Sequence, residues 1–285
     1  MMNNSETVSS KFIIGGDLEI NRLGYGAMQL TGKGVNGDMD DRSIGIKILQ
    51  YAVDNGVNFI DTAESYGPKT NEQLIADALL PYKSGLHIAT KGGFDRPSAG
   101  QWVINGNPER IAEEIDGSLK RLKVDCIDLW QLHRIDPKIP VEETLAPVAE
   151  AVKAGKIKHV GLSEVTIEQI ELAEKVVPIV SVQNYYNLHE RRWEAEVDYT
   201  AKRNIAFIPW YPLASGPDKM NELVSKIVAA HNATTAQIAL AWLLRRSPNI
   251  ILIPGTKSLE HLKENLESVK IILTEEEVKE LTEAK

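Results

Sequence analysis

The chain has 285 residues, which fits one or two ordinary domains and also a single (β/α)8 barrel, a fold of roughly 250 residues. Hydrophobic residues make up 43% of the chain and charged residues 25%, so it can bury a large core, and we expect disorder only at the ends. The formal net charge of −8 argues against nucleic acid or an anionic membrane as a partner. Any site for an anionic ligand must therefore be a local basic pocket.

No targeting or membrane segment is recognisable in the sequence. Residues 1–11 are polar and lack the apolar core of a signal peptide, and the chain has no run of about 18 apolar residues that could span a membrane. We therefore expect a cytoplasmic protein. The single cysteine, Cys126, stands in an apolar run, which predicts a buried and inert thiol rather than a nucleophile.

The first predicted element is a β-hairpin in the segment KFIIGGDLEI. Its two apolar runs are joined by Gly15, Gly16 and Asp17, which are typical turn residues. After it, eight short apolar runs alternate with longer segments of helical periodicity, the pattern of βα units with a parallel sheet. The sequence therefore predicts an α/β protein, a (β/α)8 TIM barrel with an N-terminal hairpin across its bottom and with C-terminal helices.

The barrel strands are expected to end at polar or aromatic positions, which in chain order are Met28, Asp61, Lys91, His133, Glu164, Asn184, Trp210 and Pro254. The helices between them are expected at residues 41–55, 71–80, 108–122, 141–154, 166–175, 190–203 and 234–245. Asn107 before Pro108 predicts one helix start, and Gly155 predicts one helix end. Because no linker or abrupt change of charge divides the chain, residues 1–285 are predicted to form one domain, with residues 1–10 flexible.

Four polar side chains follow the predicted second, third and fourth barrel strands. Asp61, Lys91 and His133 each close a strand, and Tyr66 lies in the loop after Asp61. Taken singly, each has an ordinary structural explanation: a helix cap, a loop aromatic, a solvated lysine or a satisfied buried histidine. Active sites of barrels lie at the C-terminal ends of the strands, and the fold itself does not require such groups there. We therefore interpret the four together as a catalytic site.

These residue types suit carbonyl reduction. Hydride arriving at a carbonyl carbon leaves negative charge on the oxygen, and an acid must neutralise that charge. Tyr66 can be the acid. The Lys91 ammonium would favour the phenolate and bring the pKa of Tyr66 closer to neutral pH, and Asp61 would anchor Lys91. His133 can donate a hydrogen bond to the same oxygen and orient the substrate.

Several motifs, in order, resemble the aldo-keto reductases: DTAESYG, IATKGG, LWQLHR, VGLSE, VQNYYN and IPGTKSLEHLKEN, over roughly residues 21–265. The resemblance implies a catalytic tetrad of Asp61, Tyr66, Lys91 and His133, with Tyr66 as general acid. It also implies NADP(H) as cofactor, bound across the barrel mouth without a Rossmann domain. In agreement, Gly24, Tyr25 and Gly26 match only the start of a dinucleotide fingerprint and are better explained as a closely packed strand.

The resemblance assigns cofactor contacts by motif. Ser163 and Gln183 are expected at the nicotinamide carboxamide, Trp210 on the nicotinamide ring, Lys257 at the 2′-phosphate and Asn265 near the adenine. A helix expected to begin just after Lys257 would add backbone N–H donors for the phosphate. No metal site is predicted. The full set of expected cofactor-binding residues is Gly26, Ala27, Met28, Asp61, Ser163, Glu164, Gln183, Trp210, Leu213, Ser215, Thr256, Lys257, His261 and Asn265.

Two residues depart from the family pattern. Glu164 stands where the family often has Asn, so a possible amide donor to the carboxamide is replaced by a carboxylate whose partner the sequence does not reveal. His261 stands where many members have an arginine for the 2′-phosphate, and a histidine is charged only part of the time near neutral pH. We therefore expect a modest preference for NADPH over NADH.

The expected substrate is a small aldehyde or ketone. The runs NRLGYGAMQL and ALAWLLRRSPNIILIPGTKS look most like a bacterial branch of the family that includes pyridoxal reductases, which makes pyridoxal one candidate. Phe94, Trp102 and Trp130 can line an apolar pocket for an aromatic ring or can equally be packing residues. Neither the natural substrate nor the oligomeric state can be deduced, and a monomer is possible.

Two other functions stay open. In the first, Lys91 forms a Schiff base as in aldolases, which leaves Asp61 and Tyr66 without a purpose. In the second, the protein is an NADP(H)-binding regulatory or redox-sensing subunit with little turnover, against which the intact tetrad argues.

Overall fold

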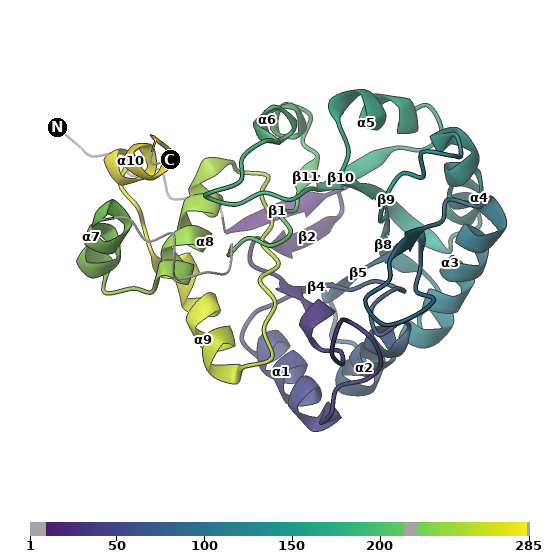
Figure 1. Cartoon of the computed structure of the whole chain (residues 1–285), viewed down its shortest axis with the longest axis horizontal. Helices are drawn as coiled ribbons and strands as arrows, with labels where there is room; N and C mark the ends of the chain where they lie inside the picture. Colours follow the sequence, from purple (N-terminus) through teal and green to yellow (C-terminus); the bar gives the residue numbers. More distant parts are fainter. Residues whose placement is uncertain (1–9, 214–221, 284–285) are drawn as a thin grey trace.

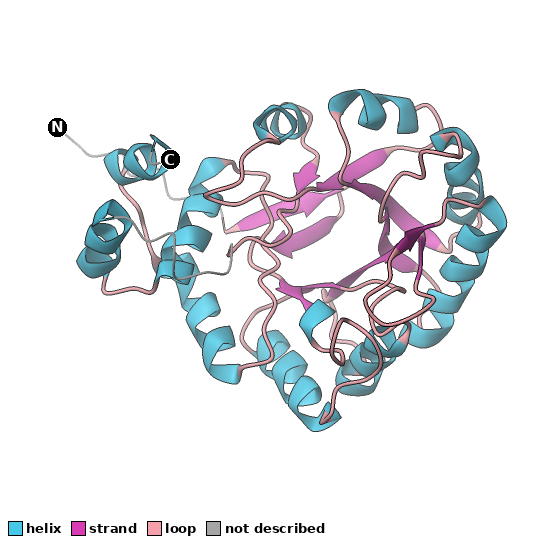
Figure 2. Ribbon diagram, viewed as in Figure 1, coloured by secondary structure: helices cyan, strands magenta, loops and turns pink. Residues whose placement is uncertain are grey.

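Seven parallel strands form one curved sheet, and helices cover its outer face (Figures 1 and 2). The structure is a computed structural model that describes residues 10–213 and 222–283. The sheet order β3-β4-β5-β8-β9-β10-β11 follows the chain, as expected when each βα unit lies beside the previous one. The strands are β3 (Tyr25–Gly26), β4 (Phe59–Asp61), β5 (His87–Gly92), β8 (Ile127–Leu132), β9 (Ile157–Ser163), β10 (Ile179–Gln183) and β11 (Ala206–Phe207).

The helices take the places that the sequence predicts, and further helices follow the last strand. Those between the strands are α1 (Arg42–Asp54), α2 (Thr70–Leu79), α3 (Pro108–Leu122), α4 (Val141–Lys153), α5 (Ile167–Ala173) and α6 (Glu194–Lys202). Beyond β11 come α7 (Glu222–His231), α8 (Thr235–Arg246), α9 (Leu259–Glu267) and α10 (Glu275–Glu283). Short 3-10 helices lie at Ala27–Gln29 and Ser268–Lys270. A small hairpin, β6 (Phe94–Asp95) and β7 (Val103–Ile104), follows β5.

The eighth predicted strand closes the barrel, although it is too irregular to count as a named strand. Leu252 forms a parallel bridge with Leu23, and Ile250 forms one with Phe207, so this segment joins both edges of the sheet. Glycine permits the close approach at one of these edges. A Cβ atom on Gly26 would lie 2.6 Å from the carbonyl oxygen of Ile253. The (β/α)8 barrel is therefore confirmed, with the first strand shorter than predicted.

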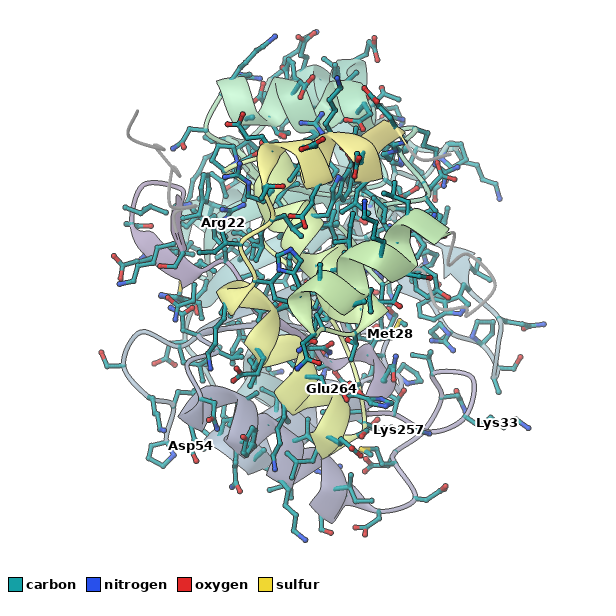
Figure 3. All side chains as sticks on the ribbon, turned by 90° about the vertical axis from the view of Figure 1, so that its left-hand side faces the viewer. Arg22, Met28, Lys33, Asp54, Lys257 and Glu264 are labelled. Carbon is teal, nitrogen blue, oxygen red and sulfur yellow. The ribbon has the colours of Figure 1, made fainter. Side chains whose placement is uncertain are left out.

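One buried arginine links the first barrel strand to the segment that closes the barrel. Arg22 is 1% exposed and lies before β3 (Figure 3). Its guanidinium donates to the carbonyl oxygens of Leu244, Ser247 and Ile250, at the end of α8 and in the closing strand. Charge-assisted hydrogen bonds of this kind compensate for burying the cation.

The predicted N-terminal hairpin is present and closes the barrel bottom. It consists of β1 (Lys11–Ile14) and β2 (Leu18–Asn21), which pair antiparallel. Ile14, Leu18 and Ile20 are almost completely buried and pack with barrel side chains that include Phe59 and Leu129. The hairpin therefore supplies the apolar floor beneath the site, which lies at the opposite end of the strands.

Local signals set the helix boundaries. The Asn107 side chain accepts hydrogen bonds from the backbone N–H of Glu109 and Arg110, and Pro108 is the first residue of α3, as predicted. Helix α6 begins four residues later than predicted. The Asn187 side chain accepts from the backbone N–H of His189 and Glu190 and so holds that segment in a turn.

The prediction for Cys126 is wrong with respect to burial. The side chain is exposed, because it precedes β8 at the bottom of the barrel instead of lying within the strand. Partial burial and the nearby carboxylate of Asp128 raise the pKa of its thiol, which keeps it protonated and argues against a nucleophile. Within residues 10–213 and 222–283, no single helix is long and apolar enough to cross a membrane; α7 and α8 meet that test only as a pair bent by 93°.

Candidate active site

The four residues singled out in the sequence meet at the C-terminal rim of the barrel. Asp61 ends β4, Lys91 lies in β5, His133 follows β8, and Tyr66 lies in the loop after β4. The Lys91 Nζ atom donates to Asp61 Oδ1 at 2.5 Å and to the Thr62 carbonyl oxygen at 2.9 Å. It also lies 3.4 Å from the Tyr66 hydroxyl. All four side chains are less than 10% exposed, so the ion pair and the phenol are largely shielded from water.

Burial has the largest effect on the two groups nearest the reacting position. It lowers the pKa of Lys91, but the attraction of Asp61 and Tyr66 outweighs it, and the net pKa of Lys91 is raised. Lys91 is therefore charged. Burial also raises the pKa of Tyr66, and Lys91 offsets this only in part. Lys91 therefore favours the phenolate as expected, but burial outweighs this effect, so the pKa of Tyr66 does not come closer to neutral pH and the phenol is protonated there.

His133 is a neutral imidazole in this environment. Burial lowers its pKa well below the usual value, and the cations Lys91, Arg134 and Arg96 lower it further. The Ser65 hydroxyl lies 3.4 Å from Nδ1. When this hydroxyl donates to Nδ1, the ring proton is on Nε2, where it can be donated to a ligand oxygen.

Three side-chain donors hold the carboxylate of Asp61. Lys91 binds one carboxylate oxygen, while the side-chain amides of Gln131 and Gln183 donate to the other at 3.2 and 2.9 Å. Gln131 is completely buried inside the barrel and was not singled out in the sequence. These contacts fix the carboxylate that orients the ammonium of Lys91.

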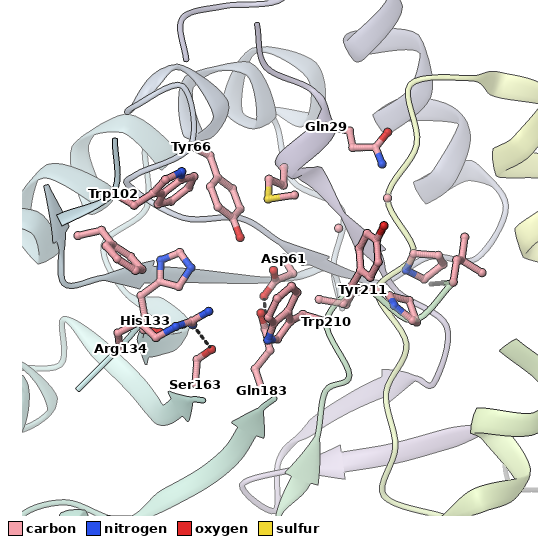
Figure 4. Close-up of a pocket in the computed structure, with 18 residues that line it drawn as sticks. Gln29, Asp61, Tyr66, Trp102, His133, Arg134, Ser163, Gln183, Trp210 and Tyr211 are labelled. Carbon is pink, nitrogen blue, oxygen red and sulfur yellow. Dashed lines mark hydrogen bonds between the residues drawn. The ribbon is translucent and has the colours of Figure 1, made fainter. Parts of the chain in front are cut away.

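A cavity of about 380 Å³ opens above this group (Figure 4). That volume is in the range of small-molecule sites. The cavity runs from the aromatic residues near His133 to the backbone of the closing strand. Its lining residues are Gly26, Met28, Gln29, Asp61, Tyr66, Phe94, Trp102, His133, Arg134, Ser163, Gln183, Trp210, Tyr211, Pro212, Leu213, Ile253, Pro254 and Gly255.

Aromatic rings form one wall of the cavity. Phe94 and Trp102 come from the β6-β7 hairpin region, and their ring centroids lie 4.8 and 6.2 Å from that of His133. Two of the three aromatic residues considered from the sequence therefore line the pocket. The third, Trp130, is 0% exposed and packs in the core between the sheet and the helices.

The structure brings six of the residues expected to bind the cofactor, besides Asp61, to the cavity wall. They are Gly26, Met28, Ser163, Gln183, Trp210 and Leu213. Ala27 is buried beside them without lining the cavity, and its carbonyl oxygen accepts from Asn71. Ser215 lies outside the described residues.

Glu164 does not line the cavity, and its carboxylate has two partners that the sequence did not reveal. One oxygen accepts from the indole Nε1 of Trp210 at 2.7 Å and from the backbone N–H of Tyr185 at 2.5 Å. The rings of Tyr185 and Trp210 also pack, with centroids 4.6 Å apart. Glu164 thus fixes the orientation of the Trp210 ring at the cavity wall.

The remaining expected cofactor residues lie just before α9 and within it, beyond the end of the cavity at Gly255; they are Thr256, Lys257, His261 and Asn265. Ser258 caps α9, as the sequence predicts for a helix beginning just after Lys257. Lys257 and His261 are exposed, and Figure 3 shows Lys257 beside α9. Asn265 is only 3% exposed, and its side-chain Nδ2 has no hydrogen-bond partner. These residues therefore offer donors for a ligand at that end of the barrel.

Arg134 is the main cavity residue that the sequence reasoning missed. It directly follows His133, and its Nη1 donates to the Ser163 hydroxyl at 2.9 Å (dashed in Figure 4). A charged residue placed just after a predicted strand end was the available signal. Tyr211, in the loop after β11, is a second missed lining residue. In the described part of the chain, no cluster of three or more His, Cys, Asp or Glu side chains could hold a metal ion.

Comparison with known proteins agrees with this geometry. A model of the aldo/keto reductase family matches residues 22–285. The chain belongs to the aldo/keto reductase family. It is 46% identical to an uncharacterized oxidoreductase of Schizosaccharomyces pombe over 94% of this chain and 88% of that protein. It is 41% identical to pyridoxine 4-dehydrogenase of Escherichia coli over 94% of this chain and 96% of that protein.

Solved aldo-keto reductases share the barrel of this enzyme. A thermostable aldo-keto reductase solved with the inhibitor epalrestat superposes with a TM-score of 0.85 at 31% identity, covering 96% of this chain and 99% of the other. The glycerol dehydrogenase of Gluconobacter oxydans gives a TM-score of 0.87 at 24% identity, over 95% and 94% of the two chains, which bears on the fold alone. The predicted family and fold are therefore confirmed.

Proposed function

We propose that this aldo/keto reductase reversibly reduces an aldehyde or ketone to the alcohol with NADPH, and that Tyr66 donates the proton. The observation that carries the proposal is the buried Tyr66 hydroxyl 3.4 Å from Lys91 Nζ, with Lys91 paired to Asp61, at the wall of a cavity shared with His133. NADPH would supply the hydride. Tyr66 and His133 would bind the carbonyl oxygen, and both side chains are less than 10% exposed, so water reaches them only from the cavity.

The protonation states fit reduction. Tyr66 is protonated at neutral pH, because burial raises its pKa, so it is an acid ready to donate. The phenolate left after donation is stabilised by the Lys91 ammonium, which Asp61 and the Thr62 carbonyl hold in place. His133 is neutral and can donate a hydrogen bond to the same oxygen without adding charge to the site.

Several residues of this chain suit the cofactor. The side-chain amide of Asn265 is buried without a partner, as a group reserved for a ligand such as the adenine would be. Lys257, His261 and the N-terminus of α9 offer positive charge and N–H donors for the 2′-phosphate. Ser163 and Gln183 line the cavity where the carboxamide is proposed to bind. A relative from Schizosaccharomyces pombe, 34% identical, is named aldo-keto reductase yakc [NADP(+)].

Pyridoxal is the substrate we propose to try first. The Escherichia coli relative at 41% identity is named pyridoxine 4-dehydrogenase, and pyridoxine is the alcohol formed by reducing pyridoxal. The aromatic wall of Phe94 and Trp102 suits a planar ring.

The alternative of Schiff-base chemistry is disfavoured by the state of Lys91. A Schiff base requires a neutral amine, whereas Lys91 has a raised pKa and donates to Asp61 at 2.5 Å. No observation favours a purely regulatory nucleotide-binding role over catalysis.

The proposal is tested by following NADPH absorbance with the purified protein and a panel of aldehydes that includes pyridoxal, with NADH in parallel. We expect aldehyde-dependent loss of NADPH and a slower loss of NADH. Tight NADPH binding without turnover on any aldehyde would contradict the proposal and support a regulatory nucleotide-binding protein instead.

A further inference from the structure

Arg134 presents a cation to the cavity without a bound carboxylate. Its Nη1 donates to the His133 carbonyl oxygen at 2.6 Å and to the Ser163 hydroxyl at 2.9 Å, both of which are neutral acceptors. In residues 10–213 and 222–283, no carboxylate oxygen lies within 4.0 Å of the Arg134 guanidinium nitrogens. The other N–H groups of Arg134 have no hydrogen-bond acceptor among these residues. Arginine has five such donors, so the guanidinium can bind a further oxygen.

The surrounding charges compensate this cation only in part, and none of them touches it. Lys91, the other cation that faces the reacting position, is neutralised by Asp61 at 2.5 Å. Glu164 is near enough to act on Arg134 electrostatically, but one of its oxygens already accepts from Trp210 and Tyr185. A partly buried cation that no carboxylate contacts favours an anionic ligand, because the ligand restores the interactions that burial removes.

The groups around Arg134 suit a planar ring. The guanidinium carbon lies 5.9 Å from the ring centroid of Phe94 and 5.8 Å from that of Trp210. Figure 4 shows Arg134 below His133, with its guanidinium directed toward Trp210 and the open cavity. A ring held in this wall, with its carbonyl oxygen at His133 and Tyr66, can turn a neighbouring substituent toward Arg134.

We propose that Arg134 is a specificity-determining residue that binds an anionic oxygen on the atom next to the one that carries the reacting carbonyl group. The preferred substrate is then an aromatic aldehyde with an ionised hydroxyl group ortho to the formyl group, a class that includes pyridoxal. This inference rests on the proposed carbonyl reduction. The anionic oxygen is bound and not chemically changed.

Two aldehydes that differ by one hydroxyl group test the proposal: 3-hydroxypyridine-4-carbaldehyde and pyridine-4-carbaldehyde. Both are assayed at a pH where absorption shows the hydroxyl to be ionised. We expect Arg134→Gln to lower kcat/KM for the hydroxylated aldehyde by roughly 10- to 100-fold, the range for a hydrogen bond to a charged group, and to change the other aldehyde by less than about threefold. Arg134→Lys keeps the charge, so its kcat/KM for the hydroxylated aldehyde should lie between that of Arg134→Gln and that of the unchanged protein.

Two controls accompany these assays. NADPH affinity, measured by fluorescence titration of each variant, should be unchanged and shows that the variant is folded. Arg203→Gln is the matched control, because Arg203 is an exposed arginine directly after α6 and is paired with Glu174, and it should behave as the unchanged protein with both aldehydes.

The other possible outcomes would each overturn this inference. Equal losses on both aldehydes, or weaker NADPH binding, would mean that Arg134 acts on the cofactor through Ser163, and would overturn the specificity role while leaving carbonyl reduction intact. If the unchanged protein shows no preference for the hydroxylated aldehyde, the substrate class is wrong. If it reduces neither aldehyde and no other carbonyl, the proposed function itself fails, and this inference fails with it.

Discussion

The buried ion pair of Lys91 and Asp61 makes a sharp prediction about stability. Lys91 is 0% exposed and donates to Asp61 Oδ1 at 2.5 Å. Lys91→Met leaves the Asp61 carboxylate buried without its cation, with only the amides of Gln131 and Gln183 as donors. Breaking one partner of such a pair costs about 3–5 kcal/mol of unfolding free energy.

Removing both charges should restore much of this stability. In Lys91→Met combined with Asp61→Asn, no charge is buried, and the new amide can still bind Gln131 and Gln183, so we expect at least about 2 kcal/mol to be regained. Urea unfolding measures both variants, and neither should reduce aldehydes. Lys153→Met is the surface control, because its pair with Glu150 is 71% exposed on both sides and should contribute less than about 1 kcal/mol. A single variant as stable as the control, or a double variant no better than the single one, would refute the reasoning.

Three further predictions address the cofactor residues and the residues behind the site. Glu164→Gln weakens the hold on the Trp210 indole, so NADPH affinity should fall roughly three- to tenfold and the tryptophan emission should change; unchanged affinity by fluorescence titration would count against the role of Glu164. Lys257→Ala should weaken NADPH binding about tenfold and NADH binding hardly at all, and equal weakening would show that the 2′-phosphate site is misplaced. The third concerns Glu114, a buried residue of α3. Burial raises the pKa of its carboxyl group from 4.5 to about 8. The stability due to its protonation is therefore fully present below pH 4.5 and is lost as the pH rises to about 8. Glu114→Gln should therefore gain stability relative to the unchanged protein over that range, by a few kcal/mol in urea unfolding; a constant difference would contradict the raised pKa.

The catalytic group could be predicted because the fold brings strand ends together. Asp61, Lys91 and His133 each lie at or next to the C-terminal end of a strand, and once the βα alternation is recognised, those ends must meet at one rim. Tyr66 lies five residues after Asp61, so its position is nearly fixed by Asp61. Whether these four side chains come together therefore depends only on the order of the strands in the sheet.

The electrostatic details could not be predicted in the same way. The two partners of Glu164 lie 21 and 46 residues further along the chain, and nothing local in the sequence links them. The pKa of Tyr66 depends on the balance between burial and the charge of Lys91, and burial is set by the whole rim. For Cys126, an apolar run predicted burial, but the residue precedes its strand and is exposed.

The most direct test of the central claim is to measure turnover and NADPH affinity of Tyr66→Phe beside the unchanged protein, with an aldehyde that the latter reduces. The change removes one hydroxyl group from a buried ring and leaves Lys91 paired with Asp61. We predict that kcat falls by roughly two or more orders of magnitude while the dissociation constant of NADPH stays the same. Undiminished turnover in Tyr66→Phe would show that another group donates the proton and would contradict the account.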